Sequence, residues 1–318
     1  MREFQLIEKY FKPLTKSHQA AQNLQDDVAK IKLKADEELV VSKDIFVEDV
    51  HFLRSQNVAK IAAKLLLTNI SDLAASGAKP LHYLLGFSKN NYTDARFLRQ
   101  FVSGLKSVQD QFQLSLIGGD TVAAKKLFFS ITIFGIIKKG KILLRNQAQD
   151  GDLIFVSGTI GDAFLGLKGI KNKYLQQRHF LPSPRVELGK QLLDKNLSRC
   201  AIDVSDGLLA DLNHICQSSQ VSAEIFLDKV PFSEAAKKTL QNNSQIKITD
   251  LICGGDDYEL IFAVNPKNHQ KILQLAQNLK LDLTCIGSFV KATNKKFSVT
   301  LFDQKNHKIT IKKSGYEH

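Results

Sequence analysis

The apolar positions of the chain follow two periods, one typical of helices and one typical of strands. Spacings of three and four residues predict helices over residues 3–14, 57–77, 92–112 and 208–216. Short apolar runs predict strands over residues 38–41, 81–87, 114–117, 127–137, 153–157 and 200–204. Because the two patterns follow one another along the whole chain, the sequence predicts an α/β (α+β) protein.

A basic loop and a turn signal interrupt this pattern near the middle of the chain. Arg145 lies in the loop, and Asp150-Gly151-Asp152 is typical of a turn. The strand pattern restarts directly afterwards. We therefore expect two domains, residues 1–147 and 148–318, each long enough to bury a core.

Carboxylates stand in a short turn between the predicted strand 200–204 and the predicted helix that begins at Leu208. Asp203 and Asp206 can converge across this corner, and carboxylate oxygens suit Mg²⁺. The Ser205 hydroxyl and the N–H groups at a helix start suit phosphate. Taken alone, the same residues are equally typical of an Asx turn followed by a helix N-cap.

Five further segments repeat this design, in which we expect a strand end or loop with small residues and a carboxylate. They contain Asp26-Asp27, Asp44, Asp72, Asp120 and Asp256-Asp257. Many carboxylates require many cations, and polyphosphates are the usual reason to gather Mg²⁺. The chain has no Walker A motif and no kinase glycine-rich loop. If ATP binds, metal ions and backbone N–H groups must therefore hold its phosphates.

Composition narrows the class of protein. The chain has 318 residues, 43% hydrophobic and 24% charged, which is typical of a globular protein. Its net charge of +12 is scattered along the sequence, which favours small anionic substrates over nucleic acid. The four cysteines form no C-x-x-C pair, and neither a signal peptide nor an apolar run of membrane-spanning length is present. We expect a cytoplasmic protein with reduced cysteines, without a nucleic-acid or membrane partner.

The motifs together resemble those of thiamine-monophosphate kinases, in the superfamily of aminoimidazole ribonucleotide synthetase and selenophosphate synthetase. The matching segments are Glu3-Phe4 with Leu6-Ile7, Asp26-Asp27, Asp44 to Phe52, Asn69 to Pro80, Gly118 to Thr121, Arg145, Gly151-Asp152, Pro182 to Arg185, Ala201 to Leu208, Gly254 to Leu260, Ile286-Gly287 and Gly315-Tyr316. The resemblance implies a PurM-like fold, with an N-terminal mixed sheet that pairs in a homodimer and a C-terminal α/β sandwich. It also implies ATP-dependent, Mg²⁺-dependent phosphorylation of thiamine monophosphate to thiamine diphosphate, by direct transfer without a protein nucleophile.

The resemblance also implies roles for individual residues, by their position in the motifs. The implied Mg²⁺ ligands are Asp27, Ser42, Asp44, Asp72, Asp120, Asp203 and Asp206. The implied ATP contacts are Gly119, Asp120, Arg145 and Ser205, and the implied substrate contacts are His51, Asp256 and Lys313. Without the resemblance, His51 could equally be a packed loop histidine, and Arg145 could form a surface ion pair.

Four positions depart from the family pattern. Gln25 stands for glycine and Lys43 for threonine, which leaves the number of Mg²⁺ ions open, while Asp256 stands for glutamate and Lys313 for an aromatic residue. Lys43 could point away from the site, or its charge could sit beside Asp44 and the phosphates and replace part of a missing cation; we expect the second.

Two alternatives to the kinase remain. One is a non-catalytic protein that binds nucleotide or thiamine phosphate, and the other is a superfamily relative that acts on another phosphate or acyl substrate. Selenophosphate synthetase is disfavoured because the first cysteine of the chain is Cys200, which leaves no cysteine in the N-terminal glycine-rich loop.

Overall fold

The computed structural model describes residues 3–293, 296–311 and 315. By their internal contacts, the residues form two compact units. Unit 1 comprises Met1–Leu73 and Ala78–Gly140, and unit 2 comprises Ala74–Gly77 and Lys141–His318.

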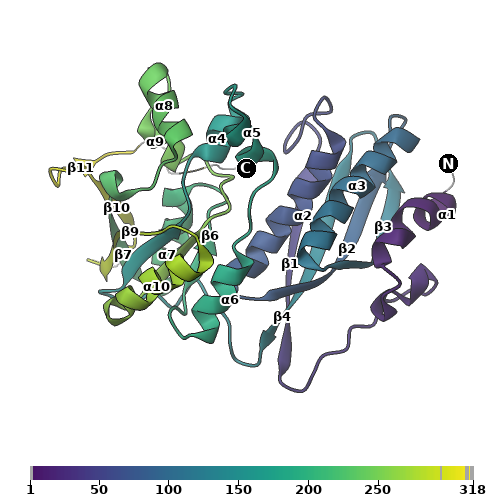
Figure 1. Ribbon diagram of the computed structural model, residues 1–318, viewed down its shortest axis with the longest axis horizontal. Coiled ribbons are helices and arrows are strands. Elements are labelled where there is room, and N and C mark those ends of the chain that lie inside the picture. The colour runs from purple at the N-terminus through teal and green to yellow at the C-terminus, as the bar shows by residue number, and fades with distance from the viewer. Residues whose placement is uncertain (1–2, 294–295, 312–314, 316–318) are drawn as a thin grey trace. The chain divides into compact units, whose positions relative to one another are not determined.

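Unit 1 is built on a mixed sheet. Its strands are β1 (Glu37–Val47), β2 (Lys79–Lys89), β3 (Ser115–Ala123) and β4 (Phe128–Lys138), and their order across the sheet is β1-β4-β2-β3 (Figure 1). β2 and β3 are parallel, whereas β4 is antiparallel to both β1 and β2. The predicted mixed N-terminal sheet is therefore confirmed.

Helices α2 (Val58–Ala75) and α3 (Ala95–Phe112) cover one face of this sheet (Figure 1). Alternate residues of β4, Phe129, Ile131 and Ile133, are fully buried on that face. The ring of Phe101 in α3 packs 4.6 Å from the ring of Phe129. The intervening residues of β4 are polar or half-buried, so the sheet has one core face and one face that is open to a ligand.

The N-terminal segment is helical, as predicted, but it changes helix type twice. It runs through α1 (Glu3–Leu6), the π-helix η1 (Ile7–Phe11), the 3₁₀ turn η2 (Lys12–Thr15) and the 3₁₀ segment η3 (Gln19–Leu24). Phe11 packs edge-on against Phe87 of β2, with the two ring centroids 5.2 Å apart. Pro13, which has no N–H group, lies in the first turn of η2.

Unit 2 contains a second, larger sheet, with strand order β11-β10-β7-β9-β5-β8-β6 among the described residues. The strands are β5 (Leu153–Ser157), β6 (Ala201–Asp203), β7 (Val221–Phe226), β8 (Leu260–Val264), β9 (Leu283–Lys291), β10 (Val299–Phe302) and β11 (Lys308–Ile309). The helices are α4 (Asp162–Leu167), α5 (Lys173–Phe180), α6 (Val186–Asp194), α7 (Leu208–Ser219), α8 (Glu234–Asn242), α9 (Ile248–Ile252) and α10 (His269–Leu279), with 3₁₀ turns η4 (Leu227–Lys229) and η5 (Pro266–Asn268).

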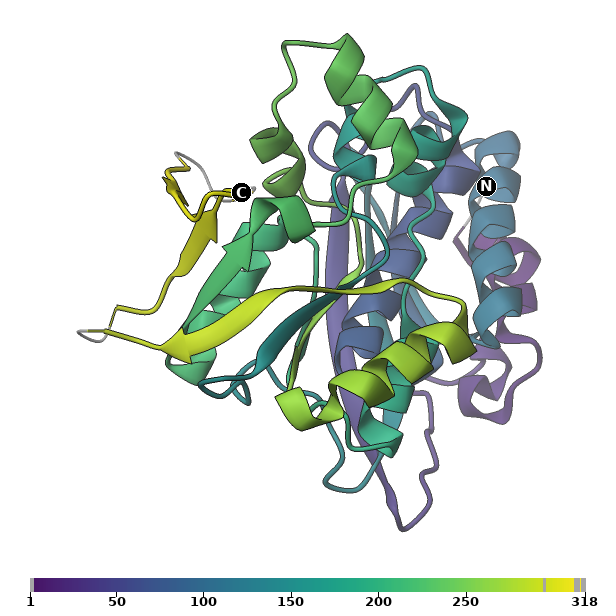
Figure 2. The same cartoon turned by 60° about the vertical axis from the view of Figure 1, so that its left-hand side comes forward.

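Two hydrophobic cores lie on opposite faces of this second sheet. In β5, Ile154 and Val156 belong to the core that includes α7, whereas Phe155 belongs to the core that includes α6 and α10. Figure 2 shows the helices α7 and α10 on either side of the strands. Because successive strand residues point to opposite faces, each strand supplies both cores. The predicted α/β sandwich is confirmed.

The structure corrects where two aspartates lie. Asp44 and Asp120 were expected at strand ends or in loops, but they are inside β1 and β3, which are longer than predicted. Asp72 is inside α2, within the helix predicted over residues 57–77. Backbone hydrogen bonds to a neighbouring strand extend both strands across polar residues, a tertiary effect that hydrophobic periodicity does not report. Between β5 and β6, residues 158–200, all described, form α4, α5 and α6, where regular alternation of helix and strand was expected.

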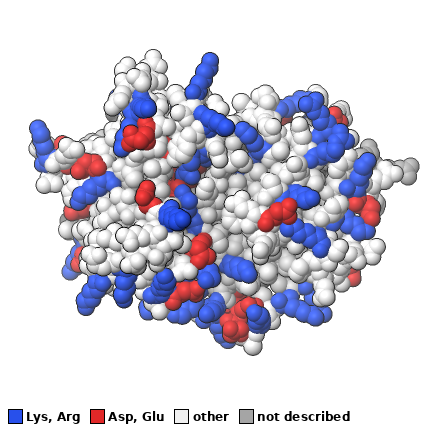
Figure 3. Space-filling view, viewed as in Figure 1, with Lys and Arg blue, Asp and Glu red and all other residues white. Residues whose placement is uncertain are grey.

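The surface carries both charge signs. On the face drawn in Figure 3, Lys and Arg side chains lie among acidic and uncharged ones. Within the described part of the chain, no helix combines the length and the hydropathy that crossing a membrane requires.

Candidate functional site

Three of the predicted metal ligands gather between β1 and α2 in unit 1. The Ser42 hydroxyl donates a hydrogen bond of 2.5 Å to Oδ2 of Asp72. Residues 42 and 44 share one face of β1, so Asp44 points to the same helix. There Asp44 is held by two residues of α2, since Thr68 donates to its carboxylate over 3.2 Å and the Asn69 side-chain oxygen accepts from its backbone N–H.

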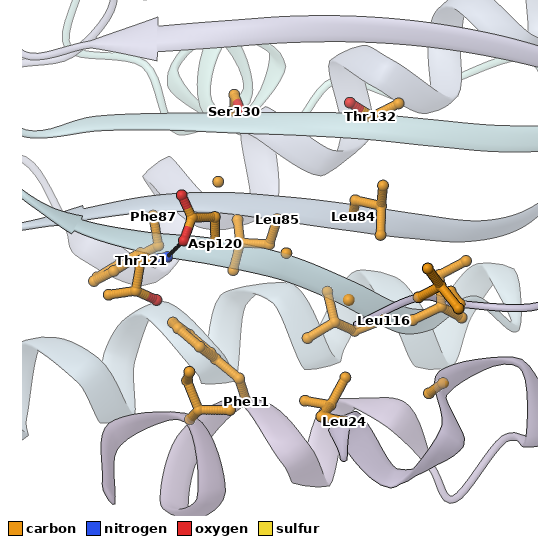
Figure 4. A pocket seen from close by; sticks show the side chains of 18 of the residues that line it. Phe11, Leu24, Leu84, Leu85, Phe87, Leu116, Asp120, Thr121, Ser130 and Thr132 are labelled. Carbon is orange, nitrogen blue, oxygen red and sulfur yellow. Dashed lines mark hydrogen bonds between the residues drawn. The ribbon is translucent and has the colours of Figure 1, made fainter. Parts of the chain in front are cut away.

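Two other predicted ligands line a pocket of about 900 Å³ on the opposite face of the sheet (Figure 4). Asp27 comes from the N-terminal segment and Asp120 from β3, and Asp26 lies beside them. The apolar part of the lining includes Phe11, Leu24, Leu84, Leu116 and Phe134. The predicted ligands of unit 1 thus form two groups, separated by the sheet.

Lys43 is not a predicted ligand, but it lines the same pocket as Asp27 and Asp120. Its ammonium nitrogen lies 3.4 Å from the Ser130 hydroxyl and 3.5 Å from the Thr132 hydroxyl, on β4. Successive residues of a strand point to opposite faces, so the expectation that this charge sits beside Asp44 is wrong. The ammonium group instead lines the same pocket as Asp120.

A glycine is required where β3 approaches β2. Gly119 has φ of +156°, and a Cβ atom there would lie 2.0 Å from the carbonyl oxygen of Leu85. Any side chain would therefore push the strands apart and displace Asp120, the next residue. The second glycine of the Gly-Gly pair before this aspartate therefore has a local structural reason.

His51, Arg145 and Lys313 were the remaining predictions from loops and the C-terminus. Nδ1 of His51 accepts a hydrogen bond of 3.1 Å from the Val47 N–H, so the ring proton belongs on Nε2, and the ring stacks on Phe46. Arg145 is exposed, and its carbonyl accepts from the Ser219 hydroxyl within unit 2. Lys313 lies outside the described residues.

In unit 2, the turn after β6 is organised by an aspartate that the sequence analysis did not single out. Asp211 Oδ2 accepts from the backbone N–H groups of Ser205, Asp206 and Gly207, at 3.0, 3.0 and 3.1 Å. Burial, together with the negative charges of Asp203 and Asp206, raises the pKa of Asp211 to about 8. The only sequence signal was an aspartate in the first turn of the predicted helix.

The same turn brings together three described side chains that could hold a metal ion. One oxygen each of Asp206 and Asp211 and one ring nitrogen of His214 lie within 4.8 Å of one another. Asp203, at the end of β6, is 3% exposed. All the predicted metal ligands offer oxygen atoms, a donor set that suits Mg²⁺ better than Zn²⁺ or copper ions.

The loop between α9 and β8 is fastened to this turn by its backbone. The N–H groups of Asp256 and Tyr258 donate to the carbonyls of Ser205 and Val204, each over 2.8 Å. A Cβ atom on Gly255 would lie 2.4 Å from the carbonyl oxygen of Ser205. The predicted substrate residue Asp256 and the predicted ligand Asp206 are therefore held in one rigid backbone arrangement.

Beneath this loop lies a buried network of charges. The Glu259 carboxylate, 1% exposed, accepts hydrogen bonds from Arg178, Arg185 and the Ser157 hydroxyl, at 2.7, 2.6 and 2.6 Å. Asp257 accepts from the N–H groups that begin α4, and burial raises its pKa to about 7. Arg185 and Glu259 were part of the quoted motifs without an assigned role. A carboxylate this deeply buried requires such donors, because a buried charge without partners is costly.

Comparison with protein families covers most of the chain. Residues 25–137 match the model of the AIR synthase related protein, N-terminal domain, and residues 149–300 match that of its C-terminal domain. The chain is 35% identical over 328 residues to the thiamine-monophosphate kinase of Haemophilus influenzae, covering 100% of this chain and 98% of the relative. It is 33% identical to that of Escherichia coli K12, covering 99% and 98%.

Solved structures agree with these sequence relatives. The crystal structure of thiamine-monophosphate kinase from Stenotrophomonas maltophilia K279a has a TM-score of 0.83 and 35% identity, covering 95% of this chain and 96% of that chain. A structure described as AaThiL complexed with AMPPCP and TMP has a TM-score of 0.77 and 27% identity, covering 100% and 99%. The hydrogenase maturation protein HypE of Escherichia coli, 21% identical with a TM-score of 0.80, shares the fold. By sequence and structure, this chain belongs to the thiamine-monophosphate kinase family.

Proposed function

We propose that this protein transfers the γ-phosphoryl group of ATP directly to the phosphate of thiamine monophosphate, which yields thiamine diphosphate. The observation that carries the proposal is the similarity to thiamine-monophosphate kinases over the full chain. The fold is shared with proteins of other names, so the fold alone would not support this substrate. A family structure described as complexed with AMPPCP and TMP supports both reactants.

The carboxylates of Asp27, Asp44, Asp72 and Asp120 and the Ser42 hydroxyl in unit 1, and the carboxylates of Asp203 and Asp206 in unit 2, would hold Mg²⁺. When bound, Mg²⁺ would neutralise phosphate charge, which is the main requirement of phosphoryl transfer between anions.

Other residues would bind and orient the two reactants. Gly119, Asp120, Arg145 and Ser205 would contact ATP. His51 would contact the substrate with its Nε2–H group, since Nδ1 is already used by the Val47 N–H. Asp256 and Lys313 are further proposed substrate contacts. Because the acceptor phosphate is already ionised at neutral pH, positioning replaces a protein nucleophile.

We also propose that the protein is a cytoplasmic homodimer with domains 1–147 and 148–318. The edge strand β1 supports the dimer, because Leu39, Val41 and Ile45 are 37%, 55% and 48% exposed on one of its faces. Four free cysteines support a reducing location. The two matched family models, which end at residue 137 and begin at residue 149, support the domain boundary.

ADP release tests the function. Purified protein with Mg²⁺ and ATP should release ADP when thiamine monophosphate is added, and should not do so with unphosphorylated thiamine. A site built around a metal-bound phosphate loses its contacts with the alcohol. Binding of both ligands without ADP release would support the non-catalytic alternative. ADP release at a rate that does not depend on thiamine monophosphate would indicate another acceptor.

A further inference from the structure

The last turn of α5 presents two consecutive buried side chains, Arg178 and His179, to the loop that carries Asp256. Nδ1 of His179 lies 3.1 Å from Oδ2 of Asp256. The histidine is 5% exposed, whereas the side chain of Asp256 is 24% exposed. The buried His179 ring thus contacts the carboxylate of Asp256, which is partly exposed to solvent.

Arg178 holds the backbone of the same loop. Its Nη2 donates to the carbonyl of Asp257 over 3.2 Å and to the carboxylate of Glu259 over 2.7 Å. Arg185 donates two further hydrogen bonds to the Glu259 carboxylate, from Nε and Nη2. The backbone of the loop is therefore fixed independently of His179, which leaves the Asp256 side chain as the part that the histidine controls.

Asp256 itself has a constrained position. Its φ is +68°, a left-handed conformation that few non-glycine residues adopt. Its N–H is bound to the Ser205 carbonyl, so the Cα–Cβ direction is set by the backbone. Only the side-chain rotamer remains to be chosen, and the contact with His179 selects one.

We propose that His179 is a positioning residue for the acceptor substrate, acting through the Asp256 carboxylate. The inference rests on the proposed function, in which Asp256 contacts thiamine monophosphate. A hydrogen bond from Nδ1 of His179 holds the carboxylate in the rotamer that meets the substrate. Loss of the hydrogen bond lets the carboxylate rotate, which weakens substrate binding without touching ATP.

Two substitutions separate the hydrogen bond from packing. Asparagine places its amide nitrogen near the position of Nδ1, whereas glutamine places it near that of Nε2. His179→Asn should keep the KM for thiamine monophosphate close to that of the wild type. His179→Gln should raise it about tenfold, the usual effect of losing a hydrogen bond to a charged group, with the KM for ATP unchanged.

A double-mutant cycle tests whether His179 acts through Asp256. In an Asp256→Ala background, His179→Gln should change kcat/KM for thiamine monophosphate no further, because the carboxylate is already absent. Additive losses would overturn the proposal. So would equal kinetics for the Asn and Gln variants, or a fall in thermal stability with both KM values unchanged.

His307→Gln is a matched control. His307 makes the same kind of contact, from Nδ1 to Oδ2 of Asp303 at 3.3 Å, but its side chain is 73% exposed, and its loss should leave both KM values unchanged.

NMR spectroscopy provides a readout that does not depend on turnover. The side-chain carboxyl carbon of Asp256 should keep its wild-type chemical shift in His179→Asn and change it in His179→Gln, because only glutamine removes the hydrogen bond. Amide hydrogen exchange at residues 255–258 should be equal in the two variants, because the loop backbone is held independently of His179. Equal carboxyl shifts in the two variants would overturn the positioning role. If the wild type does not phosphorylate thiamine monophosphate, the proposed function fails while the carboxyl shift still decides the positioning of Asp256.

Discussion

Asp206 and Asp211 lie five residues apart and have different surroundings. Asp211 is buried, and one of its oxygens accepts hydrogen bonds from three backbone N–H groups, so it stabilises the conformation of the turn. Asp206 is only half-buried at the surface of that turn. At the scale of single residues, the donors around a carboxylate decide whether it serves the fold or a ligand.

Lys43 gives a prediction at the same scale. Its ammonium group lines the pocket that also contains Asp26, Asp27 and Asp120, where it can supply part of the positive charge that phosphates need. Lys43→Thr should stay active but require more free Mg²⁺ for half-maximal rate, with a steeper dependence on Mg²⁺. The measurement is a Mg²⁺ titration at saturating ATP and thiamine monophosphate.

Lys138→Thr is the control for this titration, since Lys138 is an exposed lysine at the end of β4 and is not among the pocket residues. Its curve should match the wild type. If the Lys43→Thr curve also superimposes on that of the wild type, Lys43 has no share in the phosphate site.

At the scale of elements, unit 1 depends on how closely α2 and α3 approach each other. Gly104 of α3 faces α2, and a Cβ atom on it would lie 2.0 Å from the carbonyl oxygen of Ala59. Helix α2 carries Asp72 and the residues that hold Asp44. The packing of two helices therefore sets the position of side chains on the adjacent strand.

Gly104→Ala tests this close approach. In an open helix the substitution should stabilise by about 1 kcal/mol. Here the added methyl group must separate the helices, and we expect a loss of about 1–3 kcal/mol in the free energy of unfolding, measured by urea denaturation. The exposed neighbour Ser103 is the control, because Ser103→Ala should be neutral or slightly stabilising. Equal stabilities of the two variants would contradict the packing argument.

At the scale of the whole molecule, the exposed face of β1 is unusual for an isolated chain. Edge strands of monomers commonly carry charges or prolines that prevent pairing. This face of β1 does carry Lys43, but the apolar residues around it, Leu39, Val41 and Ile45, are exposed. A second copy of the chain is the occupant that the proposed homodimer requires. Covering these side chains would remove apolar surface from water.

The dimer is tested by charging this face. The double variant Val41→Glu and Ile45→Glu should shift the protein from dimer to monomer in sedimentation equilibrium, because each dimer would bury four carboxylates beside only two Lys43 ammonium groups. Leu167→Glu, at a position 57% exposed in unit 2, should leave the mass unchanged. A monomeric wild type, or a dimeric double variant, would contradict the proposed interface.

The sequence by itself determined the features that depend on local pattern. Apolar spacing locates α2 and β5 almost to the residue, and the acidic glycine-flanked motifs indicate the family without any geometry. Side-chain period and backbone preference are properties of neighbouring residues, so a single chain reports them. The sequence also indicates the family, because each motif is a run of consecutive residues and the motifs follow one another in a characteristic order along the chain.

Only the tertiary structure decided which side chains share a face and what each one meets. The extension of β1 through Ser42 and Asp44 depends on hydrogen bonds to β4, about 90 residues away in the chain. In the extended strand, the side chains of Lys43 and Asp44 point to opposite faces of the sheet. Likewise, His179 acquires its partner Asp256 from a segment far along the chain. Burial and long-range pairing belong to the folded chain, and no local pattern encodes them.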